Sequence, residues 1–105
     1  MRPEEQLASQ GAAAAETTLQ AAEATERRLR EQINDLVKAR ARADSERIRL
    51  KERSKLRGAE PMLETVADRY AHQSERLDGE IESLRTSLRE QEAATEAARA
   101  DEAGA

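Results

Sequence analysis

Apolar residues recur at alternating spacings of three and four along two long stretches of the chain. In the first stretch they are Leu19, Ala22, Leu29, Ile33, Leu36, Ala43 and Leu50, with Glu26, Arg40 and Arg47 completing the row. In the second they are Leu63, Ala67, Tyr70, Leu77, Ile81, Leu84 and Leu88, with Ser74 and Gln91 completing it. This heptad spacing is typical of α-helices that pack together as a coiled coil.

Gly58 and Pro61 interrupt the pattern between the two stretches. Gly suits the left-handed residue just after a helix, and Pro suits the first turn of the next one. A Pro inside one continuous helix would cost about 3 kcal/mol. The sequence therefore predicts a flexible tail at 1–16, a helix at 17–57, a turn at 58–61, a helix at 62–98 and a flexible tail at 99–105.

The two rows match best when the helices run antiparallel. With Leu36 opposite Ile81, large residues meet large ones and small residues meet small ones, as in Leu29 with Leu88 and Ala43 with Ser74. The same register sets Arg40 against Leu77, and sets Arg47 against Tyr70, whose ring its stem would cover. Further from the turn the pairing weakens, and both ends are expected to fray.

We therefore predict an all-α fold, a two-helix antiparallel coiled-coil hairpin that assembles into a higher-order helical bundle. The alternative is an extended parallel dimeric coiled coil kinked at Gly58 and Pro61, in which Arg40 and Arg47 would each oppose its own copy. The predicted core consists of Leu29, Ile33, Leu36, Leu50, Tyr70, Leu77, Ile81, Leu84 and Leu88.

A second apolar face runs along the first helix, away from the core row, through Ile33, Val37, Ala41 and Ile48. One hairpin cannot cover both faces, so we expect Val37 and Ile48 to be buried by another helix, from a second copy or from a different protein. The alternative interpretation is that they are scattered exposed aliphatic residues.

Composition argues against a globular enzyme. The 105 residues include only 15 Leu, Ile and Val, no Phe or Trp, and Tyr70 as the sole aromatic residue. The 18 basic residues nearly balance the 22 acidic ones, which favours a solvated coiled coil over disorder. The chain has no Cys, no Gly-rich phosphate loop and no nucleophile beside a His. We expect no catalytic residue, no cofactor and no small-molecule substrate.

His72 is the only His, and Asp68 and Glu75 lie within one helical turn of it. A metal site normally needs three or four converging ligands, and His72 falls at an outward heptad position, so no metal is expected. Asp68 is expected to pair with His72 along the helix. No apolar run approaches a membrane span and no secretory signal begins the chain, so we expect a soluble intracellular protein of unspecified compartment.

Basic residues are concentrated at 38–57, which holds nine of the 18. The candidate contacts for an acidic partner, such as nucleic acid or acidic tubulin tails, are Arg47, Arg49, Lys51, Arg53, Lys55 and Arg57. The alternative is that acidic residues of the second helix, such as Glu64 and Asp68, neutralise them. No aromatic residue lies among them, so base stacking is not expected.

These observations predict a non-enzymatic structural, scaffolding or adaptor module that mediates protein–protein association, with a protein partner or further copies of itself. The alternative function is electrostatic binding of an acidic polymer through 38–57. In outline the predicted hairpin resembles the helical arms that some proteins project toward RNA, polymerase or client surfaces, a likeness of shape alone.

Overall fold

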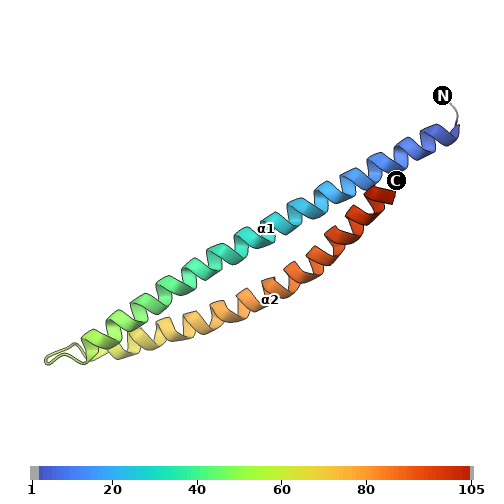
Figure 1. The fold of residues 1–105 in the computed structure, drawn as a ribbon. Coiled ribbons are helices and arrows are strands. Elements are labelled where there is room, and N and C mark those ends of the chain that lie inside the picture. The colour runs from blue at the N-terminus through green and yellow to red at the C-terminus, as the bar shows by residue number, and fades with distance from the viewer. Residues whose placement is uncertain (1–2, 105) are drawn as a thin grey trace. The chain divides into compact units, whose positions relative to one another are not determined.

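The computed structural model describes the backbone of residues 3–104 and the side chains of residues 11–104. It consists of two long helices, α1 at Pro3–Ser54 and α2 at Met62–Gly104, which confirms the all-α prediction (Figure 1). Both helices extend beyond the predicted bounds at the chain ends, because Ala and Glu dominate there and are strong helix formers. The flexibility predicted for 1–16 and 99–105 stays a prediction.

The chain packs as two units, each of which combines a part of α1 with a part of α2. The turn unit comprises residues 32–84, and the terminal unit comprises residues 3–31 together with 85–104. In the turn unit the chain reverses direction after α1, so that α2 runs antiparallel to it as a hairpin (Figure 1). The alternative of an extended parallel coiled coil is therefore wrong, whereas the higher-order bundle stays a prediction.

The connection between the helices begins at the end of α1. The Ser54 hydroxyl donates a hydrogen bond of 2.7 Å to the carbonyl of Lys51, which satisfies one of the carbonyls left over at the helix end. The amide of Ala59 donates to the carbonyl of Leu56 at 3.1 Å, closing a four-residue turn. Gly58 is the third residue of this turn and has φ of 81°, a left-handed conformation that favours Gly. Gly58 thus shapes the turn itself, beyond the end of α1.

Pro61 immediately precedes α2, where its missing amide removes no helical hydrogen bond. The amide of Leu63 donates to the carbonyl of Glu60 at 3.2 Å across this Pro. Glu64 lies in the first turn of α2, where a negative charge interacts favourably with the helix dipole. These residues explain why a new helix starts within a few residues of the turn.

The core of the turn unit is a single row of mostly small side chains. The residues buried there are Ala43, Leu50, Ala67, Ser74 and Ile81. Two polar contacts join the helices beside this row: the Ser74 hydroxyl donates to Asp44 at 2.7 Å, and Arg40 donates to Asp78 at 2.8 Å. Both contacts agree with the antiparallel register predicted from the sequence.

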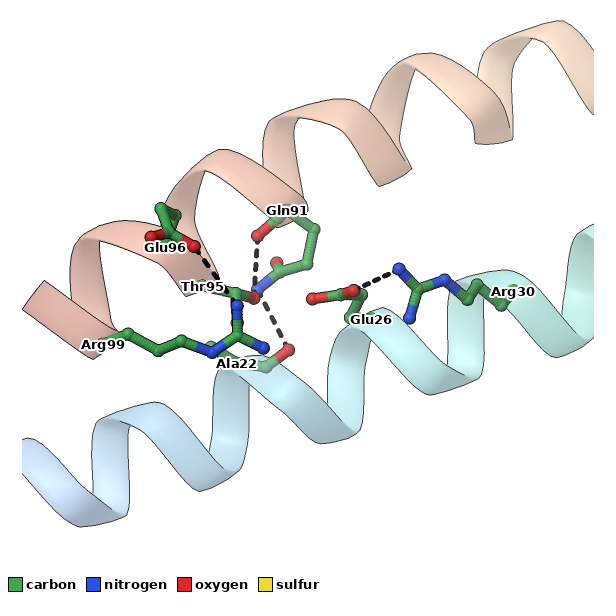
Figure 2. Close-up of polar contacts among 7 residues, drawn as sticks. All are labelled: Ala22, Glu26, Arg30, Gln91, Thr95, Glu96 and Arg99. Atoms are coloured by element: carbon green, nitrogen blue, oxygen red, sulfur yellow. Dashed lines mark hydrogen bonds and ion pairs between the residues drawn. The ribbon is translucent and has the colours of Figure 1, made fainter.

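The terminal unit has a seam of small and polar residues, namely Glu26, Thr95 and Ala98, all of which are buried. Figure 2 shows Gln91 of α2 reaching toward α1, where its amide donates to the carbonyl of Ala22 at 3.2 Å. The Thr95 hydroxyl donates to the Gln91 carbonyl at 2.9 Å, which satisfies a buried polar group. The seam is thus better formed here than the sequence indicated, because Ala and Thr let the two backbones approach.

Candidate interaction surfaces

Two helices alone cover the predicted core residues unequally. Leu50 and Ile81 are buried, with Ile81 only 1% exposed. The half-buried ones are Leu29, Ile33, Leu36, Tyr70, Leu77, Leu84 and Leu88. A coiled-coil side chain is enclosed only where residues of a facing helix surround it. The hairpin therefore leaves part of its own leucine row accessible.

The accessible part of the row lies in the turn unit as an apolar hollow of about 650 Å³, which we name the Leu36 groove. Its lining residues are Leu36, Arg76, Gly79, Glu80, Ser83 and Leu84. A second hollow of about 290 Å³ is lined by Leu36 and Leu84 together with Gln32 and Asp35. The same two leucines line both hollows, so this part of the seam is incompletely covered.

Four α2 residues in the Leu36 groove, Arg76, Gly79, Glu80 and Ser83, were not singled out by the heptad pattern. A Cβ placed on Gly79 would meet no other atom within 4 Å, so the groove is open above it. Arg76 and Glu80 lie one helical turn apart on either side of Gly79, and neither has an ion-pair partner within the described part of the chain. The signal that could have found this site is a Gly inside a helical stretch with a Ser four residues later.

The second apolar face is only partly covered. Ile48 is 53% exposed and Val37 is half-buried, and neither of them lines the Leu36 groove. Leu56 and Met62 on either side of the turn are also exposed, at 66% and 64%. The hairpin thus exposes more aliphatic surface than the sequence alone indicated.

Most of the candidate basic contacts are paired with acidic side chains. The pairs are Arg47 with Asp44 at 4.0 Å, Arg49 with Glu46 at 2.6 Å, Lys51 with Glu64 at 3.7 Å and with Asp68 at 4.0 Å, and Lys55 with Glu52 at 3.6 Å. Only Arg53 and Arg57 of the six lack such a partner among residues 11–104. Both line a hollow of about 250 Å³ beside the turn.

Two arginines are held more firmly in their charged form. Hydrogen bonding to Asp78, reinforced by its charge, raises the pKa of Arg40, and Glu46 does the same for the pKa of Arg49. When folding raises the pKa of a cation, the cation stabilises the folded state fully at every pH below its pKa in the unfolded chain. This stabilisation is lost only as the pH rises through its pKa in the folded chain. These pairs therefore contribute throughout the neutral range.

Two contacts expected from the sequence do not form among the described side chains. Arg47 is directed to Asp44, which lies on the same helical face, and makes no cation–π contact with the ring of Tyr70. Asp68 lies beside Lys51 on the other helix and does not pair with His72. In both cases an opposite charge within reach determines where the side chain lies.

His72 is exposed on α2. Within the described range, no three His, Asp or Glu side chains are placed together so that they could hold a metal ion. Over the same residues, neither helix contains a segment both long and apolar enough to cross a membrane.

Comparison of the chain with models of known protein families, with curated proteins and with solved structures gave no match. The surfaces of the hairpin are therefore the basis for assigning a function. Two of them stand out: the Leu36 groove, and the unpaired basic residues at the turn.

Proposed function

We propose that this chain is a non-enzymatic association module, a helical hairpin that binds a further helix in the Leu36 groove. The observation that carries the proposal is that Leu36 of α1 and Leu84 of α2 belong to the predicted seam, yet stay half-buried and line two hollows. Each Å² of apolar surface removed from water contributes about 25 cal/mol. A helix laid in the groove would therefore gain from covering both leucines.

The small core of the hairpin supports the same proposal. Within the described residues, the buried apolar side chains are Ala43, Leu50, Ala67, Ile81 and Ala98, so three of the five are Ala. Chains with so little buried apolar surface usually need further stabilisation, and association with other helices is one source of it. Association would thus serve folding and function together.

Photocrosslinking from single cysteines tests the proposal, and the absence of native Cys makes the labelling unambiguous. A photoreactive label on Ser83→Cys lies in the Leu36 groove, whereas the matched label on Ser45→Cys lies beside Ile48 on the second apolar face. We expect efficient crosslinking to another polypeptide, or to another copy, from position 83 only. Crosslinking from position 45 alone would assign association to the second face, and none from either would refute the proposal.

A second candidate function is favoured by the two unpaired cations at the turn. Arg53 and Arg57 lie in one hollow with the exposed Leu56, so an acidic polymer such as nucleic acid or a tubulin tail has a place to bind. If these two cations alone contact duplex DNA, the logarithm of affinity should fall with the logarithm of salt concentration with a slope of about −1.8. Arg53→Gln should flatten that slope by about half, and Arg49→Gln, which removes an arginine already paired with Glu46, should change it little.

A further inference from the structure

We infer that the helix bound in the Leu36 groove is α2 of a second copy of this chain, packed antiparallel to α2 about a twofold axis close to Gly79. This inference rests on the proposed function and names its partner. It follows from three features of the groove: its pair of opposite charges, its glycine, and the contrast with the second apolar face.

The charges on the groove are complementary to themselves. Arg76 and Glu80 line the same hollow one turn apart, and neither is paired within the described part of the chain. A twofold axis reverses the order of residues, so that Arg76 of one copy lies opposite Glu80 of the other, and the converse pair forms on the far side of the axis. One residue pair thus provides two ion pairs, whereas a parallel arrangement in register would oppose like charges.

Gly79 lies between these two charges, and the hairpin itself does not require a glycine there. Gly weakens the interior of a helix relative to Ala, and a Cβ at this position would meet no atom within 4 Å. The hairpin alone would therefore accept Ala. A glycine at this point does permit the backbone of a second helix to approach closely, and Ser83, one turn later, is also small. α2 is thus narrow on this face where the second copy is expected to cross.

The second apolar face is a poorer surface for self-association. Ile48 lies within 38–57, where nine basic residues stand against three acidic ones, Asp44, Glu46 and Glu52. Asp78, Glu64 and Asp68 of α2 pair with Arg40 and Lys51 of this segment, which leaves its basic residues in a smaller excess. A twofold interface on that face would bring two copies of this excess together, and like charges in an interface are unfavourable. The Leu36 groove has one charge of each sign instead, and so it is the surface that fits another copy.

Charge reversal tests both the partner and the geometry. Arg76→Glu and Glu80→Arg should each weaken dimerisation by about tenfold or more, because two like-charge contacts replace two ion pairs. Mixing the two variants in equal amounts should restore dimerisation, because one copy then presents two carboxylates across the axis from two arginines of the other. Sedimentation equilibrium over a concentration series measures each dissociation constant.

Matched controls separate the local effect from the change in net charge. Arg28→Glu and Glu90→Arg make the same two charge changes at exposed positions that line neither hollow beside Leu36. They should leave dimerisation unchanged. Gly79→Gln should fill the groove and abolish dimerisation while circular dichroism shows retained helix, because Gln is a better helix former than Gly. Gly11→Gln, also at an exposed helical glycine, should have no effect.

Two results would overturn the inference. A wild-type chain that remains monomeric at about millimolar concentration excludes a second copy as the partner, since such binding would be weaker than about 4 kcal/mol. Crosslinking of Ser83→Cys to a different protein would then leave the proposed function standing without this partner. A dimer that is indifferent to Arg76→Glu, or that mixing of the two variants does not restore, shows that the copies associate through another surface.

Discussion

Truncating two residues that share a layer of the predicted seam should give unequal losses of stability. Leu36 and Ile81 face each other in one layer of the predicted seam, but Ile81 is 1% exposed whereas Leu36 is half-buried and lines two hollows. Buried Ile→Ala substitutions cost about 2 to 5 kcal/mol, and a thin two-helix seam can partly close the resulting cavity. We therefore expect Ile81→Ala to cost about 2 to 3 kcal/mol.

Leu36→Ala should cost about half as much, roughly 1 to 1.5 kcal/mol, because part of its side chain already contacts water in the single hairpin. In terms of the unfolding equilibrium constant, Ile81→Ala should raise it about 30- to 150-fold, and Leu36→Ala only about 5- to 12-fold. The difference between the two variants is thus the quantity that measures how open the Leu36 groove is.

Urea unfolding followed by far-ultraviolet circular dichroism measures both values, at concentrations low enough to keep the chain monomeric. Ser87→Ala, at an exposed position of α2, is the control and should change the free energy of unfolding by less than about 0.5 kcal/mol. Equal losses for Ile81→Ala and Leu36→Ala would refute the reasoning, because Leu36 would then be as enclosed as Ile81 and no open groove would exist.

Three further substitutions test other parts of the hairpin. Gly58→Ala should lower the free energy of unfolding by about 1 to 2 kcal/mol, because Ala is strained at a φ of 81°. Gly11→Ala within α1 should instead stabilise the hairpin slightly, and urea unfolding measures both effects. Gln91→Leu should remove the hydrogen bond across the terminal unit, worth about 0.5 to 1.5 kcal/mol, and hydrogen exchange should lose protection there and not in the turn unit. Asp78→Asn should destabilise the hairpin at low salt and have little effect at high salt, because its partner Arg40 is solvent-exposed and the interaction is screened; unfolding at two salt concentrations checks this.

The two helices and the reversal between them could be predicted from the sequence because each depends on a local rule. Heptad spacing places Leu50 and Ile81 on one face, and Gly58 with Pro61 cannot continue a helix. The helix ends were harder to predict. Thr95 and Ala98 continue the heptad spacing, but they are too small for spacing alone to distinguish a packed seam from a frayed end, yet both are buried once the helices meet. Their burial depends on how closely two backbones approach, which residue type alone does not determine.

The Leu36 groove could not be predicted from periodicity for a related reason. Spacing identifies which side chains face the seam, but it does not tell how completely one facing helix encloses them. Gly79 lies outside the heptad row, and yet it lines the Leu36 groove. Arg47 shows the same limit for side chains: the register set it against Tyr70, whereas it pairs with Asp44 on its own helix, and surface contacts of this kind differ little in free energy.

The two ends of the described chain belong to one unit, and this has a mechanical consequence. Tension applied between residues 12 and 104 acts first on the terminal unit, where the layers of Thr95 and Ala98 are small and Gln91 provides a cross-helix hydrogen bond. Helices pulled apart from one end separate layer by layer, so each step breaks few contacts and needs little force. The larger side chains of Ile81 and Leu50 come under tension later. We therefore expect a chain that extends gradually under load and closes again when released, with the turn at Gly58 keeping the two helices together.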